Sequence, residues 1–212
     1  MTAIRHHRLA PLHVCALFLA LAGCLGTSRP ARFYTLEPLQ ARSVPGSTAA
    51  DAALAVGPVE LPDYVDRPQI VTRAGANELL IAEFDRWGGS LGEQVANALV
   101  ATLRDCLASR QIAVVQWRSA ILPGGTPHRV AVSISRFDGV PGQSVVLQAR
   151  WELIAQKDGK VESLEVKDAS VTEEVDGTGY GPLVAAMQRA LTRFGQQMGD
   201  SVAATKQMAS AP

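Results

Sequence analysis

Cysteine is scarce in this chain, and its three occurrences differ in setting. Cys15 and Cys24 lie in or just after an apolar stretch near the start, whereas Cys106 stands alone in the rest of the sequence. If Cys24 carries a modification, as argued below, no pair of cysteines is left to form an intramolecular disulfide. The fold must then be stabilised by its hydrophobic core, and a chain of 212 residues is long enough to bury one.

An excess of charge of either sign is also missing, because 20 Lys and Arg residues face 20 Asp and Glu residues. Removal of residues 1–23, which is argued below, takes away Arg5 and Arg8 and leaves a net charge of about −2. A protein that binds phosphate backbones normally carries a basic surplus. The composition therefore argues against a nucleic-acid-binding function.

The residue types that carry catalysis or bind metals are few as well. His128 is the only histidine after His13, and because it follows Pro127 we expect it in a loop. One histidine and one free thiol are too few for a metal site or a catalytic triad. The glycine-rich segments lack the Lys and Ser/Thr of a phosphate-binding loop. We therefore predict no enzyme activity, no cofactor and no metal.

An enzyme that uses Cys106 or His128 is the alternative. Cys106 falls on the apolar stripe of a predicted helix. A free cysteine at such a position usually packs as a small hydrophobic residue, which favours a packing role for Cys106.

The first 24 residues have the layout of a secretory signal. A basic start at residues 5–8 precedes an apolar run of about 14 residues, which ends in Leu21-Ala22-Gly23-Cys24. As a helix this run spans about 21 Å, less than the ~30 Å hydrocarbon core of a bilayer. The last four residues resemble the lipobox of bacterial lipoproteins, in which the thiol receives a diacylglyceryl group and the chain is cut just before the cysteine. We expect residues 1–23 to be removed and Cys24 to carry the lipid; an ordinary cleaved signal is the alternative.

Periodicity and turn residues divide the rest of the chain. We expect residues 24–53 to hold the lipidated N-terminus, a first short strand and a flexible linker, and residues 203–212 to form a flexible tail. Between them, residues 54–202 are predicted to form a single domain. Its expected strands cover residues 54–61, 69–73, 78–84, 112–117, 130–135, 144–155 and 160–174, and its expected helices cover about 90–108 and 182–202.

The order of these elements predicts an α+β fold. We expect a mainly antiparallel sheet with two amphipathic helices packed on one face, and the other face open to water or to a partner. Gly57-Pro58 interrupts the strand at residues 54–61, which indicates an edge strand or a β-bulge. Asp158-Gly159 is a hairpin turn signal between the two longest strands.

Several segments together resemble one known family. The lipobox is followed by Phe33-Tyr34-Thr35-Leu36, by VGPVELPDYVDRPQIV at residues 56–71, and by Trp87 shortly before a helix that opens at Leu91. This combination resembles the ABC-type transport auxiliary lipoproteins, the PqiC-like family, over nearly the whole mature chain. The segment from Gly57 to Ile70 is the most specific part of the resemblance.

The resemblance implies a non-catalytic, periplasm-facing lipoprotein that serves a system moving lipids or other apolar molecules between inner and outer membranes and supports envelope integrity. The implied partners are a mammalian-cell-entry (MCE) domain substrate-binding protein and, indirectly, an ABC permease and ATPase. The implied membrane contact is through the acyl chains, and homo-oligomerisation stays open. Leu25 follows Cys24, where an Asp would favour the inner membrane, so the resemblance favours an outer-membrane anchor.

The Pro-framed loop within the specific segment is the candidate contact surface. We predict that Tyr64, Asp66, Arg67 and Pro68 contact the transport partner, because aromatic and Arg side chains are enriched at interfaces. The alternative is structural: Arg67 pairs with Asp63 or Asp66, and Tyr64 packs on the core.

Two further functions stay open at this point. One is a structural outer-membrane lipoprotein without a transporter. The other is direct lipid carriage, which would require a sizeable apolar cavity.

Overall fold

The computed structural model describes residues 29–36, 52–117, 128–157 and 160–205. The lipobox with Cys24, the predicted linker beyond residue 36, Asp158-Gly159 and the predicted tail beyond residue 205 lie outside this part of the chain. In chain order the elements are β1 (Arg32–Tyr34), β2 (Ala52–Glu60), β3 (Gln69–Arg73), β4 (Leu79–Trp87), α2 (Leu91–Leu107), the 3-10 helix η2 (Ala108–Arg110), β5 (Ile112–Gln116), β6 (His128–Gly139), β7 (Ser144–Lys157), β8 (Lys160–Glu174) and α3 (Tyr180–Ala204).

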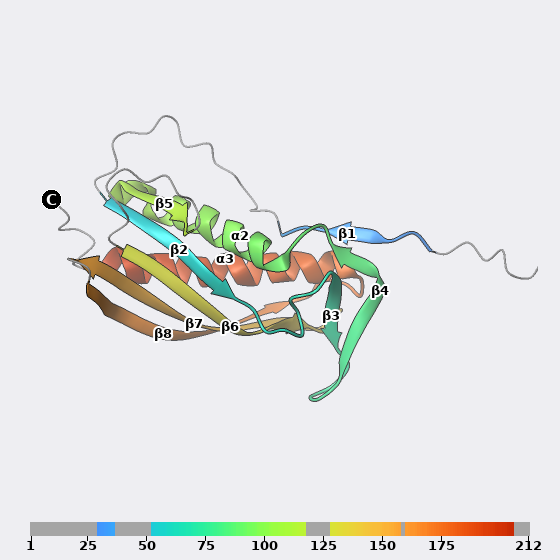
Figure 1. The fold of residues 1–212 in the computed structure, drawn as a ribbon. Coiled ribbons are helices and arrows are strands. Elements are labelled where there is room, and N and C mark those ends of the chain that lie inside the picture. Colours follow the sequence, from blue (N-terminus) through green and yellow to red (C-terminus); the bar gives the residue numbers. More distant parts are fainter. Residues whose placement is uncertain (1–28, 37–51, 118–127, 158–159, 206–212) are drawn as a thin grey trace, which may run out of the picture. The chain divides into compact units, whose positions relative to one another are not determined.

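The larger of two sheets has the strand order β5-β2-β6-β7-β8, and α2 and α3 cover one of its faces (Figure 1). The predicted α+β class and the two helices on one face are confirmed. The sheet is mixed rather than purely antiparallel: the long strands β6, β7 and β8 pair antiparallel, as expected, whereas β2 pairs parallel with both β5 and β6. Parallel neighbours need a crossover connection, and here the chain between β2 and β5 passes through β3, β4 and α2.

A second, three-stranded sheet with the order β1-β4-β3 was not expected. β3 and β4 form an antiparallel hairpin, and β1 adds in parallel with Arg32 opposite Asp85. The Asp85 carboxylate accepts hydrogen bonds from Arg32 Nη2 at 3.1 Å and from the Tyr34 hydroxyl at 2.7 Å. These contacts attach the first short strand to the folded body.

The core lies between the larger sheet and the two helices. The residues that form the apolar stripe of α3 are at most 2% exposed: Leu183, Ala186, Met187, Ala190, Leu191, Phe194 and Met198. The inward-facing residues of β6 and β7 pack against them. At the start of α2 the Ser90 hydroxyl accepts a hydrogen bond from the Glu93 amide at 3.4 Å, so Ser90 caps the helix.

Two glycines let α2 and α3 approach closely. A Cβ added at Gly199 would lie 2.8 Å from the Cβ of Cys106, and one added at Gly195 would lie 2.9 Å from Thr102 Cγ2. Burial, together with the nearby Asp200 and Asp105, raises the pKa of the Cys106 thiol. Cys106 therefore packs in the helix interface, in agreement with the packing interpretation.

Two local expectations are corrected. β2 is a central strand, and its Gly57-Pro58 step coincides with a shift in the β2–β6 register between Val56 and Val59, so the bulge interpretation holds and the edge interpretation is wrong. His128 is the buried first residue of β6 rather than a loop residue. It pairs with Leu54 of β2 and Ala155 of β7. Because of these long-range pairings, β6 begins before residue 130, where the sequence pattern places the start of the strand.

Within the described ranges, no helix is both long enough and apolar enough to cross a membrane.

Candidate functional site

The segment between β2 and β3, residues 61–68, is called the β2–β3 loop. It is compact, because the amides of Val65 and Asp66 donate to the Pro62 carbonyl oxygen at 3.0 and 3.2 Å. The Val65 side chain is buried, and the Trp87 amide donates to the Pro68 carbonyl oxygen at 2.8 Å. Both ends of the loop are thus held against the folded body.

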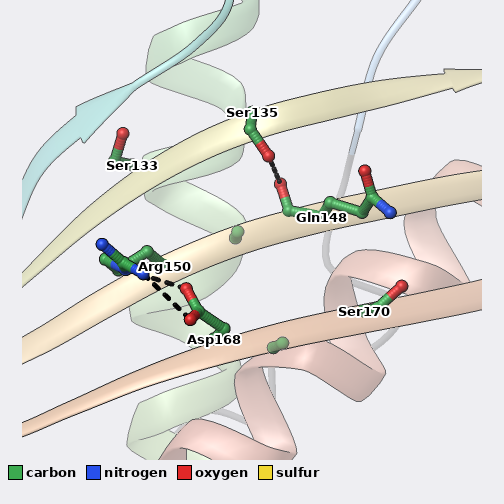
Figure 2. A pocket seen from close by; sticks show the side chains of 8 residues that line it. Ser133, Ser135, Gln148, Arg150, Asp168 and Ser170 are labelled. Atoms are coloured by element: carbon green, nitrogen blue, oxygen red, sulfur yellow. Dashed lines mark hydrogen bonds and ion pairs between the residues drawn. The ribbon is translucent and has the colours of Figure 1, made fainter.

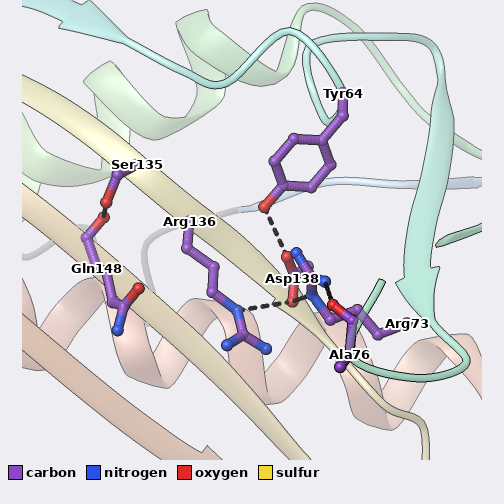
Figure 3. A network of polar contacts seen from close by, with 7 residues as sticks. All are labelled: Tyr64, Arg73, Ala76, Ser135, Arg136, Asp138 and Gln148. Carbon is purple, nitrogen blue, oxygen red and sulfur yellow. Dashed lines mark hydrogen bonds and ion pairs between the residues drawn. The ribbon is translucent and has the colours of Figure 1, made fainter. Parts of the chain in front are cut away.

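Tyr64 points inward from this loop. Its hydroxyl donates to Asp138 Oδ2 at 2.6 Å, and the Arg73 guanidinium lies 5.9 Å from the centre of its ring (Figure 3). Burial is the main cause that raises the pKa of Tyr64, and the hydrogen bond to Asp138 adds to it. The position of Tyr64 fits the structural alternative for this residue.

The Asp138 carboxylate, which is fully buried, joins three parts of the fold (Figure 3). Its Oδ1 atom accepts from Arg73 Nε at 2.9 Å and from Arg136 Nε at 3.0 Å. The hydrogen bond to Asp138 raises the pKa of Arg73. We call Tyr64, Arg73, Arg136 and Asp138 the Asp138 cluster; it connects the β2–β3 loop and β3 of the smaller sheet with β6 of the larger one.

The other three predicted contact residues face solvent. Asp66, Arg67 and Pro68 are exposed. In the part of the chain that the structure describes, no ion pair joins Arg67 to Asp63 or Asp66. The loop therefore presents these side chains on a backbone that the Asp138 cluster holds in place.

A groove of about 330 Å³ lies beside the exposed part of the loop. We call it the cis-proline groove, because the Gly57-Pro58 peptide bond in its wall is cis. The β2–β3 loop contributes Asp66, and the start of α2 contributes Ser90 and Glu93. The remaining lining residues are Val56, Gly57, Pro58, Val59, Gly92, Ala96, Gln116 and Trp117.

Gly57 and Trp117 shape the wall of this groove. Gly57 has a φ of 128°, and a Cβ added there would lie 3.1 Å from the Cβ of Trp117, so only glycine fits without strain. The Trp117 amide donates to the Val56 carbonyl oxygen at 2.9 Å, and the Arg129 guanidinium stacks 4.5 Å from the centre of the indole ring. Trp117 remains 42% exposed and thus offers an aromatic surface at the rim.

Sequence reasoning missed Trp117 and Arg129 as members of this surface. The available signals were a Gly-Pro step inside a strand and a tryptophan at the end of another strand. Neither signal shows that the two strands are neighbours.

The groove combines carboxylates with an aromatic wall. Asp66 and Glu93 supply the carboxylates, and Gln116 Nε2 donates to Glu93 Oε2 at 3.1 Å. Across the described ranges, no group of three or more His, Cys, Asp or Glu side chains could hold a metal ion. The arrangement suits contact with a basic or aromatic side chain of another molecule.

A second hollow, of about 590 Å³, lies on the face of the larger sheet opposite the helices (Figure 2). Its lining includes Ser133, Ser135 and Ser170 and the Arg150–Asp168 ion pair, whose Nε–Oδ1 distance is 2.8 Å. Both partners of this pair are more than half exposed, so it contributes little to stability. The hollow is an open stretch of sheet surface, whereas an acyl chain would need an enclosed cavity.

The two side chains considered for catalysis are poorly suited to it. Burial lowers the pKa of His128, and its Nδ1 atom has no hydrogen-bond partner among the residues that the structure describes. The raised pKa of Cys106 disfavours the thiolate that a nucleophile requires.

Comparison with known proteins gives one family. The family model described as "ABC-type transport auxiliary lipoprotein component" matches residues 34–199. The sequence is 26% identical over 136 residues to the intermembrane transport lipoprotein PqiC of Escherichia coli, an alignment that covers 64% of this chain and 69% of that protein.

Two solved structures share the fold. The crystal structure of an uncharacterized protein is similar with a TM-score of 0.67 at 20% identity, and the similarity covers 82% of this chain and 99% of that one. A Xanthomonas campestris protein gives a TM-score of 0.60 at 20% identity over 76% of this chain and 88% of its own.

Proposed function

The chain belongs to the family of ABC-type transport auxiliary lipoprotein components, and from this premise we propose that it is the non-catalytic, membrane-anchored auxiliary subunit of an MCE-type lipid transport system. The observation that carries the proposal is the extent of the family match, which runs from β1 to the last turns of α3. The family is an auxiliary transport component rather than a class of enzymes, and its members are lipoproteins that face the periplasm.

The proposed anchor is a diacylglyceryl group on Cys24, after removal of residues 1–23. Leu25 in the following position supports sorting to the outer membrane. In this proposal the domain works between the two membranes and supports envelope integrity by assisting lipid movement between them.

Substitution of Cys24 tests the anchor. The Cys24→Ser variant should lose incorporation of radiolabelled palmitate and should no longer float with membranes in a density gradient. Cys106→Ser is the matched control and should keep both properties, because Cys106 packs between α2 and α3. Palmitate incorporation by the Cys24→Ser variant would contradict the proposed modification site.

The proposed partner surface is the cis-proline groove together with exposed Asp66, Arg67 and Pro68. This surface combines the features that favour protein contacts: an exposed tryptophan, an arginine and a rigid backbone. The exposed carboxylate of Asp66 would receive a basic side chain of the MCE-domain partner. Tyr64 contributes indirectly, because it fixes the loop through Asp138.

Site-specific crosslinking tests both the partner and the surface. A photo-crosslinking residue is placed at Arg67 in the full-length lipoprotein, and at Glu162 on exposed β8 as the control. After irradiation of whole cells, solubilised envelopes are purified and the products identified by mass spectrometry. We expect an MCE-domain protein at position 67 and none at position 162.

Other outcomes separate the parts of the proposal. Equal capture at both positions would contradict the surface but not the transport assignment. Capture of outer-membrane or cell-wall components alone would favour the alternative, a structural outer-membrane lipoprotein without a transporter.

A further inference from the structure

Large exposed apolar side chains gather on the smaller sheet. Seven such side chains occur among the described residues, and four of them, Phe33, Leu79, Leu80 and Ile81, belong to β1 or β4. The smaller sheet has only three strands, yet it carries more than half of these exposed apolar side chains. We call residues 74–81, all of which are exposed, the hairpin tip.

Three successive residues on the β4 side of the hairpin tip are exposed, although Val71 and Thr72, their partners on β3, are buried. Successive side chains of a strand point to opposite faces, so a hairpin with one buried face would alternate between exposed and buried residues. Instead, Leu79, Leu80 and Ile81 are 37%, 51% and 52% exposed in succession. In Figure 1 this end of β3 and β4 extends away from the five-stranded sheet and from both helices.

The tip is also held rigidly. Arg73, the last residue of β3, donates to the buried carboxylate of Asp138 at 2.9 Å and to the Ala76 carbonyl oxygen in the turn at 2.9 Å (Figure 3). The Ala74 amide donates to the Glu78 carbonyl oxygen at 3.1 Å and closes the same turn. A rigid apolar projection loses little conformational entropy when it enters a membrane or binds a protein.

The composition of the tip favours a lipid surface over a charged partner. Glu78 is the only ionisable residue among residues 74–81, and the turn itself is Ala-Gly-Ala-Asn. Large exposed apolar patches mark protein or membrane interaction sites, and a tip without basic residues fits zwitterionic better than anionic lipid.

The number of residues between Cys24 and β1 limits how far the hairpin tip can lie from the membrane that holds the lipid. Eight residues lead from Cys24 to Arg32, a reach of at most about 27 Å. Arg32 lies opposite Asp85 on β4, and Leu80 is five residues from Asp85, about 17 Å along an extended strand. A lipid on Cys24 and the hairpin tip can therefore touch one surface at the same time.

We infer that the hairpin tip inserts into the surface of the bilayer to which Cys24 is anchored, as a second membrane contact beside the acyl chains. This inference rests on the proposed lipidation of Cys24. The second contact fixes the orientation of the domain on the membrane, which the acyl chains alone would leave free.

Depth-dependent quenching tests the insertion. The full-length lipoprotein carries Leu80→Cys in a Cys106→Ser background, is labelled with an environment-sensitive fluorophore and is reconstituted in phosphatidylcholine–phosphatidylethanolamine vesicles that contain a lipid-borne quencher. The control carries the label at Val161→Cys, an exposed apolar position at the start of β8. We expect quenching at position 80 to be at least threefold stronger than at position 161.

Flotation of the same vesicles shows whether the acyl anchor is present. Flotation with equal, weak quenching at both positions would overturn the inference and leave the anchor intact. Shielding at position 80 that begins only when the transport partner is added would also overturn it, in favour of a protein contact. Loss of flotation would overturn the anchor and the inference together.

Discussion

Each strand of the five-stranded sheet contacts α2 or α3, whereas the three-stranded sheet meets the larger sheet through β3 and β6. In the larger sheet the inward residues of β6 and β7 are almost completely buried. In the smaller sheet Ile70, Val71, Ala82 and Trp87 are buried and belong to the core, whereas the residues from Leu79 to Ile81 are exposed. The larger sheet thus supplies most of the core, and the smaller sheet adds to it but also presents apolar groups outward.

Because of this difference, substitutions in the two regions should affect different properties of the protein. Substitutions in the larger sheet and its helices should change the free energy of unfolding. Substitutions at the hairpin tip should leave it unchanged and alter only interactions with a membrane or partner. The Asp138 cluster lies where the two regions meet, so it should affect both.

Two matched leucines give the largest expected contrast. Leu103 of α2 is fully buried and Leu80 of the hairpin tip is half exposed. Leu103→Ala should lower the free energy of unfolding by about 4 kcal/mol, because it leaves a cavity in the core. Leu80→Ala should change it by less than about 0.5 kcal/mol. Urea unfolding followed by circular dichroism measures both, and similar losses would show that the tip is packed.

The junction between the sheets should respond to Asp138→Ala. The substitution removes the acceptor of Tyr64, Arg73 and Arg136 and should lower the free energy of unfolding by about 3 kcal/mol. The loss stays moderate because the arginine side chains are 21% and 33% exposed and can rehydrate.

Hydrogen exchange distinguishes the junction from the core in this variant. The amides of β3 should exchange faster than in the unmodified protein, and those of β7 should change less. Asp168→Ala, which removes an exposed partner of Arg150, is the control and should have no measurable effect on either. Equal acceleration in β3 and β7 would contradict a junction role for Asp138.

The close contact of α2 and α3 should make Gly199 sensitive to added volume. Gly199→Ala should lower the free energy of unfolding by about 2 kcal/mol, because the new Cβ would lie 2.8 Å from that of Cys106. Gly181→Ala, near the start of the same helix and with open space around it, should be neutral or stabilising by up to about 1 kcal/mol. Thermal unfolding of the two variants measures the contrast, and a stable Gly199→Ala variant would mean that the helices can separate without loss.

Local signals explain what the sequence predicted correctly. The stripe from Leu183 to Met198 repeats at helical spacing, Ser90 caps α2, and β7 and β8 pair around Asp158-Gly159. Each of these features is decided by residues close in sequence.

Long-range pairing explains what the sequence did not reveal. β2 lies between β5 and β6, and β1 pairs with β4, although the paired strands are far apart in the chain. The cis-proline groove depends on these pairings, because Gly57 meets Trp117 only when β2 and β5 are neighbours. Asp138 was missed for the same reason: its three partners come from separate segments, and no local pattern marks them.

Acid should weaken the larger sheet through His128, the smallest of the expected effects. Burial lowers the pKa of His128 in the folded state below its ordinary value of about 6.5, so the unfolded chain binds a proton more readily. The stability contributed by the neutral imidazole is fully present above pH 6.5 and is lost as the pH falls below that value. His128→Leu should remove this dependence.

Unfolding experiments at pH 7.5 and 5.5 measure the effect on the mature lipoprotein, in which His128 would be the one remaining histidine. His128 pairs with Leu54 and Ala155, so acid should accelerate hydrogen exchange in β2, β6 and β7 before it affects the hairpin tip. If β4 opened first, or if His128→Leu kept the same pH dependence, the acid sensitivity would come from carboxylates elsewhere. The two sheets would then not differ in their sensitivity to acid, and they would differ only in how their side chains are packed.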